Sequence, residues 1–196
     1  MEQFNALVLA FFFYSFVGQF WEICLLRFQI GEWRYKGFLR IPMSPIYGLS
    51  SLIMISIAQF FQNNPIIIFI LSVIVITFAE YLTSLIMEKI FKRTWWDYRS
   101  PHHPKIVKKY QFEGRISLPV SLTWGALSLV VVYIIQPHVA RFANEIFSHF
   151  AFLISAILLI IFAIDTTVST ILNIRARNKK VSLGKINERK NENPRN

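Results

Sequence analysis

Residues 65–88 read PIIIFILSVIVITFAEYLTSLIME, and this stretch decides the class of fold. It is long enough to cross about 30 Å of hydrocarbon as a helix. Its only charged residues are Glu80 and Glu88. The connection before it is Gln62-Asn63-Asn64, and Pro65 suits the first turn of a helix. We therefore predict that this stretch and the apolar residues before it form a tight antiparallel hairpin of membrane helices.

The whole chain repeats this pattern. Of its 196 residues, 54% are hydrophobic and 16% are charged, yet its net charge is +10. Disordered or nucleic-acid-binding chains with such a basic excess are poor in large apolar residues, whereas this chain contains 19 Phe, so we expect no nucleic-acid partner. The predicted fold is all-α, a polytopic membrane helix bundle over residues 1–173 with a basic disordered tail over residues 174–196. Its five transmembrane helices are predicted at residues 4–26, 42–61, 65–88, 117–136 and 148–173, with Pro137 ending the fourth.

The distribution of Lys and Arg predicts the orientation, because positively charged loops stay on the cytoplasmic side. Residues 27–41 contain four of them, and residues 89–116 and 174–196 contain eight each. The segments that alternate with these contain Arg141 alone. We expect the N-terminus outside and the C-terminus in the cytoplasm. Four or six spans would place one eight-charge segment on the other face, so the tally favours an odd number.

The chain offers few residues for redox or metal chemistry. Cys24 is the only cysteine, so neither an internal disulfide nor a Cys-based zinc site can form. His102 and His103 lie between two prolines, a pattern typical of a solvated turn. We expect no cofactor and no metal.

Carboxylates inside apolar spans are costly and need partners. Glu22, Glu80 and Asp165 each lie in the cytoplasmic half of a span, and Gly18 permits close helix approach on the first span. At helical spacing each joins a polar stripe, which predicts a polar cavity or packed polar core open to the cytoplasm. The stripes are Ser15, Gln19 and Glu22; Thr77, Glu80, Tyr81, Ser84 and Glu88; and Asp165, Ser169 and Asn173.

The roles of these acids and of Arg115 stay open at this point. Arg115 is the predicted compensating cation of a substrate or ion site, but it could instead extend to lipid headgroups. Glu80 and Asp165 lie at nearly the same depth. In one interpretation these two acids bind a substrate or ion or transfer a proton. In the other they are protonated and only form hydrogen bonds between neighbouring helices.

Two cytoplasmic segments add candidates. Trp95, Trp96, Asp97 and Tyr98 follow the third span, where an interfacial aromatic belt explains the rings but not Asp97. Pro42 and Pro45 begin the second span, followed by Tyr47 and Gly48. Prolines disturb the first turns of a helix, and irregular backbone at membrane depth survives only when it is buried or lines a cavity. We expect this segment to contribute to the same polar site.

These residues carry a resemblance to a known family. The order Lys36-Gly37-Phe38-Leu39, Pro45-Ile46-Tyr47-Gly48, Glu80, Glu88, Trp95-Trp96-Asp97-Tyr98, Gly114-Arg115-Ile116 and Trp124-Gly125 is similar to that of the CmpB-like ABC-transporter type IV permeases. The resemblance covers about residues 14–137 and implies a multi-pass protein of the bacterial cytoplasmic membrane. Residues 101–112, rich in Lys and His, depart from the Asn-containing link of family members.

The resemblance and the buried acids favour a small transport component whose substrate is unknown. The chain has no P-loop, so ATP-driven transport would need a separate ATPase subunit, for which residues 89–116 form the only large loop. Anionic lipids are the other expected partner, through the basic tail. Two alternatives are an enzyme acting on a lipid or lipid-linked substrate, with Glu80 or Asp165 as base and Arg115 binding phosphate, and a non-catalytic membrane scaffold.

Overall fold

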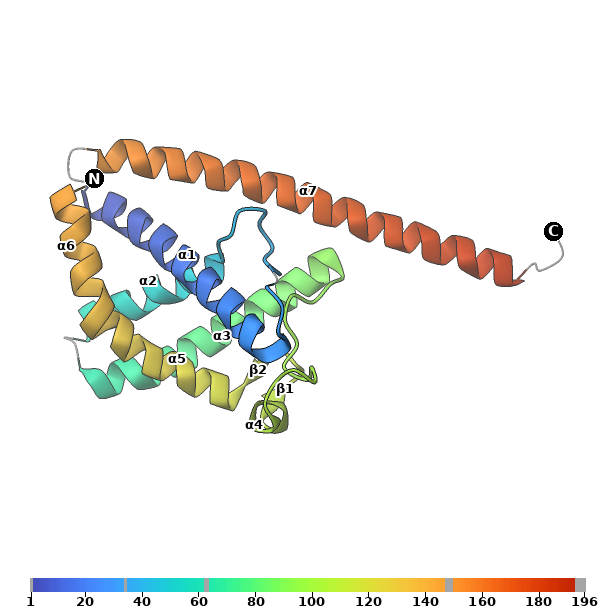
Figure 1. The fold of residues 1–196 in the computed structure, drawn as a ribbon, viewed down its shortest axis with the longest axis horizontal. Helices are drawn as coiled ribbons and strands as arrows, with labels where there is room; N and C mark the ends of the chain where they lie inside the picture. Colours follow the sequence, from blue (N-terminus) through green and yellow to red (C-terminus); the bar gives the residue numbers. More distant parts are fainter. Residues whose placement is uncertain (1, 34, 62–63, 147–149, 193–196) are drawn as a thin grey trace.

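A computed structural model of the chain describes residues 2–33, 35–61, 64–146 and 150–192, and most of these are helical (Figure 1). The prediction of an all-α membrane bundle is confirmed. The link between α3 and α5 contains the short helix α4 and the two-residue antiparallel strands β1 and β2. The elements are α1 (Glu2–Ile30), α2 (Pro45–Phe60), α3 (Pro65–Phe91), α4 (Lys105–Lys109), β1 (Gln111–Phe112), β2 (Ile116–Ser117), α5 (Leu118–Val130), η1 (Val131–Ile135), α6 (Gln136–Ile146) and α7 (Ala151–Glu192).

Four helical stretches of the described residues are long and apolar enough to cross a membrane, and α2 is a shorter apolar helix. The four are Gln3–Phe28, Pro65–Phe91, Leu118–Phe142 and Ala151–Lys179. Together with α2 they correspond to the five predicted spans. The helix α2 begins at Pro45 rather than at the predicted residue 42. Pro42 and Pro45 lack amide donors, so the helix begins at the second proline and residues 42–44 remain non-helical.

The structure differs from the prediction at Pro137, which does not end the fourth span. The π-helix η1 lies just before this proline, and α6 continues the helix to Ile146. The Gln136 N–H bonds the Val131 carbonyl, which is the wider spacing of a π turn. A proline donates no hydrogen bond and crowds the carbonyl of the preceding turn. The wider turn accommodates both effects, and the helix continues.

The structure also differs in residues 174–192, which we predicted to be a disordered tail. Here α7 runs on without a break as far as Glu192. Lys, Arg and Glu favour helix almost as strongly as Ala does, and no proline occurs before Pro194. High charge does not break the helix. Residues 193–196 of the predicted tail lie outside the described residues.

Close packing of α1 against α2 positions the interior of the bundle. A Cβ added to Gly18 would overlap the ring of Tyr47, and one added to Gly48 would overlap the Ser15 hydroxyl. The predicted close approach at Gly18 is therefore confirmed. These contacts bring Tyr47 against α1, and its ring packs on Trp124 of α5 with centroids 5.4 Å apart.

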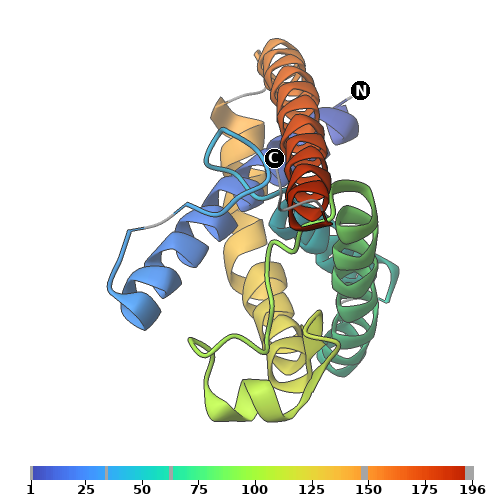
Figure 2. The same cartoon turned by 90° about the vertical axis from the view of Figure 1, so that its right-hand side faces the viewer.

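The basic links share one end of the bundle. Figure 1 shows the α1–α2 link, the α3–α5 link and the C-terminal half of α7 at this end. The starts of α1, α3 and α7 lie at the other end. Figure 2 looks toward the basic end and shows the end of α3 beside α7, with α4 well below them. We call this the basic end.

Candidate functional site

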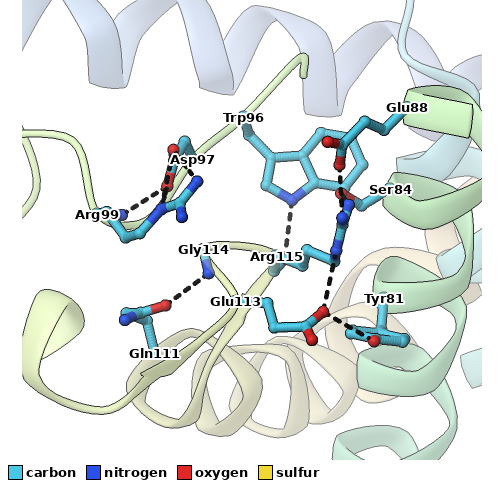
Figure 3. A network of polar contacts seen from close by, with 10 residues as sticks. All are labelled: Tyr81, Ser84, Glu88, Trp96, Asp97, Arg99, Gln111, Glu113, Gly114 and Arg115. Carbon is cyan, nitrogen blue, oxygen red and sulfur yellow. Dashed lines mark hydrogen bonds and ion pairs between the residues drawn. The ribbon is translucent and has the colours of Figure 1, made fainter. Parts of the chain in front are cut away.

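The link between α3 and α5 folds back against the polar stripe of α3. The helix α3 ends at Lys92, whose positive φ of 54° turns the chain, and residues 95–98 then pack against the β1–β2 hairpin. The indole N–H of Trp96 donates to the Arg115 carbonyl at 2.9 Å. The Tyr98 N–H donates to the Gly114 carbonyl, also at 2.9 Å. Figure 3 shows the Trp96 contact, which joins the two parts of the link.

The hairpin turn requires its glycine. Glu113 and Gly114 have positive φ values of 52° and 71°. A Cβ on Gly114 would overlap the Asp97 carboxylate. The Gly114 N–H donates to Gln111 Oε1 at 2.5 Å. The Gly-Arg-Ile motif therefore serves to place Arg115 over α3.

Arg115 pairs with a carboxylate of α3, but not with the one we predicted. Its guanidinium forms ion pairs with Glu88 at 2.5 Å and with Glu113 at 3.3 Å, and it donates to the Ser84 hydroxyl at 3.2 Å. Glu80 lies eight residues before Glu88, or about 12 Å deeper along the helix. The hairpin places Arg115 over the last turns of α3, so it compensates Glu88 rather than Glu80.

Tyr98 takes the position at Glu80 that we predicted for Arg115. Its hydroxyl donates to Glu80 Oε1 at 2.6 Å, and the Glu80 residue is only 4% exposed. Burial raises the pKa of Tyr98 well above its ordinary value, so this hydroxyl remains protonated and donates. Trp124 lies beside Glu80. Among the described residues, neither Glu80 Oε2 nor the Trp124 indole N–H forms a hydrogen bond, and both atoms are buried.

Glu22 completes an inner polar cluster. It lies within electrostatic range of the Tyr47 and Tyr98 hydroxyls and of Lys36. Four helices and the link thus each supply one side chain. The inner cluster consists of Glu22 from α1, Tyr47 from α2, Glu80 from α3, Tyr98 from the α3–α5 link and Trp124 from α5.

Asp165 bonds backbone groups of the α1–α2 link instead of the inner cluster. Its Oδ2 accepts hydrogen bonds from the backbone N–H groups of Arg40 at 2.8 Å and Ile41 at 3.3 Å. The neighbouring Leu39 and Met43 are almost fully buried. Asp165 on α7 therefore holds the irregular entry to α2, and it has partners other than those of Glu80. The irregular entry is only partly buried, because Pro42 is exposed and Pro45 is half-buried, and of the predicted residues at this entry Tyr47 lies nearest to Glu80.

A second polar space lies on the outer side of the same link. It is a cavity of about 290 Å³ between α3 and the hairpin, and we call it the outer cavity. Asp97 and Arg99 form an ion pair of 2.7 Å at its edge, and this guanidinium holds the pKa of Asp97 below its usual range. Consecutive residues thus serve different spaces, because Asp97 lines the outer cavity and Tyr98 contacts Glu80. The lining consists of Ser84, Glu88, Thr94, Trp96, Asp97, Arg99, Glu113, Gly114 and Arg115.

Some residues of this site were not predicted. Glu113 accepts from the Tyr81 hydroxyl at 2.9 Å while it pairs with Arg115, and Gln111 holds the turn. The sequence signal that could have predicted this pairing is the opposite charge of Glu113 and Arg115, two residues apart. The described residues contain no group of three or more His, Cys, Asp or Glu side chains that could hold a metal ion.

The fold and the site define a multi-pass helical membrane protein with a polar cluster beneath one folded link. The chain belongs to the family described as Putative ABC-transporter type IV, whose model matches residues 9–170. This match extends beyond the resemblance we predicted, because it includes α7 as far as residue 170. No curated protein and no solved structure matches the chain.

Proposed function

We propose that this protein is the membrane-spanning, permease-like component of a transporter, with the inner cluster as its substrate or ion site. The observation that carries the proposal is Glu80. Glu80 bonds Tyr98 through one oxygen, and its other oxygen is buried with no hydrogen bond among the described residues, although the Trp124 indole lies close to this carboxylate. Leaving a buried acceptor unpaired costs about 1–3 kcal/mol, a cost that binding of a substrate or cation would offset.

The α3–α5 link supports a coupling role. Tyr98 belongs to this link and caps Glu80, while Arg115 of the same link is tied to Glu88. Movement of the link would uncover Glu80 and would also break the contacts around Arg115. A partner that pulls on the link could therefore change access to the inner cluster.

A separate ATPase subunit is the partner we propose for this movement. The chain has no phosphate-binding P-loop of its own. The helix α4 presents Lys105, Ile106 and Lys109 as exposed side chains on the outside of the link. We expect the ATPase to contact this helix and to act on Glu80 through Tyr98.

The test uses the intact tagged chain, cross-linked in its native membranes and then purified. An ATPase subunit should copurify, and reconstituted ATPase activity should fall at least tenfold in the Glu80→Gln variant while the subunit stays bound. Glu32→Gln is the control, because Glu32 is an exposed carboxylate in the α1–α2 link. Absence of an ATPase after cross-linking, or full activity of Glu80→Gln, would contradict the proposal.

The enzyme alternative has less support. It assigned Arg115 to a substrate phosphate and Glu80 or Asp165 to general base catalysis. Arg115 is instead neutralised by Glu88 and Glu113. Neither Glu80 nor Asp165 lines the outer cavity that contains Arg115. A scaffold role would be favoured only if both arms of the test above fail.

A further inference from the structure

A large groove lies between the end of α3 and α7, apart from the inner cluster. Its volume is about 840 Å³, and the ends of two predicted spans form its walls. On α3 it extends from Leu85 past Phe91, and on α7 it extends from Asn173 to Val181. We call it the basic groove because five cations line it. One is Arg115, and the other four are Lys89, Lys92, Arg93 and Arg177.

The charge of the groove is unbalanced. Among the described residues that line it, Glu88 is the only carboxylate, and Arg115 already pairs with Glu88 at 2.5 Å. The ion pairs of the described residues include none of the four cations. The groove therefore carries about four uncompensated positive charges, which favours an anionic ligand.

Two of the cations are held in place by neighbouring groups. Arg177 of α7 donates to the Ile90 carbonyl of α3 at 2.7 Å, so the guanidinium bridges the two helices. Arg93 lies over the Trp95 ring, 5.2 Å from its centroid. A ligand would meet these two guanidinium groups already positioned, which reduces the entropy lost on binding.

The apolar part of the lining indicates which anion fits. Leu85, Phe91, Ala176 and Val181 line the groove together with the cations. The candidate span of α3 ends at Phe91, and basic residues begin on α7 just after Asn173, so the groove lies at the level where hydrocarbon meets water. Basic pockets between helices at this level suit lipid headgroups, with the acyl chains against the apolar residues.

We propose that the basic groove binds the phosphate headgroup of an anionic phospholipid. This site differs from a general attraction of the basic tail to the membrane, because it requires particular cations of α3 and α7 around one groove. It also does not depend on the proposed transport function, since no residue of the inner cluster lines it.

The test uses the full chain in neutral detergent micelles and three probes: dioctanoyl phosphatidylglycerol, dioctanoyl phosphatidylcholine and inorganic phosphate. Native mass spectrometry counts the bound molecules. We expect saturable binding of phosphatidylglycerol, and about tenfold or greater weakening in the combined variant Lys89→Gln, Lys92→Gln and Arg93→Gln. The matched control removes three charges from α4 through Lys105→Gln, Lys108→Gln and Lys109→Gln, and it should bind as the original chain does.

A second variant guards against misfolding of the first. Val181→Asp places a negative charge in the groove and removes no hydrogen-bonding side chain. The variant should fold, because Val181 is 52% exposed. It should also weaken phosphatidylglycerol binding. Equal loss in the α4 control would overturn the proposal, and so would equal affinity for phosphatidylcholine. Inorganic phosphate that binds as tightly as phosphatidylglycerol would show that the groove takes a free anion rather than a lipid.

Discussion

At the residue scale, the site depends on side chains whose types were predictable and whose partners were not. The sequence placed Glu80 on an inward polar stripe and Arg115 near the cytoplasmic ends of the spans. The partner of each depends on how the α3–α5 link folds back, which helical periodicity does not encode. Tyr98 was predicted only as part of an aromatic belt, because a tyrosine after a span usually serves that purpose.

Gly114 should tolerate no side chain. We predict that Gly114→Ala lowers the free energy of unfolding by about 2–3 kcal/mol, because it combines an unfavourable positive φ with overlap of Asp97. Gly31→Ala is the matched control, since Gly31 has a similar φ of 76° but would meet only Arg27 at 3.6 Å. It should cost about 1 kcal/mol. Thermal unfolding in detergent measures both, and equal losses would mean that the Asp97 contact contributes nothing.

His103 should make the α3–α5 link sensitive to acid. Burial and the neighbouring His102 lower the pKa of His103 below its ordinary value of 6.5, although Asp97 opposes this. As pH falls, His103 therefore takes up its proton at a higher pH in the unfolded link than in the folded link. The folded link loses stability as pH falls below about 6.5. Protection of residues 95–117 from hydrogen exchange should decrease between pH 7.5 and 5.5.

The variant His103→Gln should remove much of this decrease. His102→Gln should reduce it only in part, because His102 acts through its charge alone. An unchanged decrease in the His103→Gln chain would assign it to other titrating groups.

At the element scale, the length of each apolar run predicted where a helix lies, whereas the effect of each proline on its helix was only partly predictable. The third span was well predicted, because an unbroken apolar run followed by basic residues has one simple interpretation. Pro45 begins α2 as a first-turn proline should, whereas Pro137 is absorbed by η1 inside a continuous helix. Sequence alone does not distinguish a proline that ends a helix from one that a π turn accommodates.

Asp165 should prove to be an anchor between elements. We predict that Asp165→Ala lowers the free energy of unfolding by about 1–3 kcal/mol, because the Arg40 and Ile41 N–H groups lose their acceptor. Asp165→Asn keeps an acceptor oxygen and should cost less than half as much. Thermal unfolding compares them with Thr167→Ala, whose exposed hydroxyl bonds only its own helix. An Asn variant as unstable as the Ala variant would show that the negative charge itself matters.

At the scale of the whole molecule, the composition predicted the class of fold. It did not predict how the helices pack against one another. Hydrophobic runs located the four candidate membrane spans and the shorter apolar helix α2, while close contacts such as Gly18 against Tyr47 emerge only when two helices are placed together. The same holds for the basic groove, whose cations lie about 85 residues apart in the sequence on α3 and α7.

The orientation of the bundle can be tested by labelling. In a Cys24→Ser background, we expect Gln3→Cys to react with an impermeant maleimide in intact cells, and Lys108→Cys to react only after lysis. The physical reason is the retention of basic links in the cytoplasm. Both positions are accessible on the described chain, since Gln3 is exposed and Lys108 is partly exposed. Labelling of Lys108→Cys in intact cells would reverse the assignment.

The length of α7 has a consequence for where its charges act. Figure 1 shows this helix running straight past the rest of the bundle. The predicted span on this helix ends at residue 173, and the helix continues to Glu192, about 28 Å further along its axis. Ions screen charge over about 8 Å at physiological salt. The end of this helix would then extend into the aqueous phase, beyond the range over which the bilayer surface charge is felt.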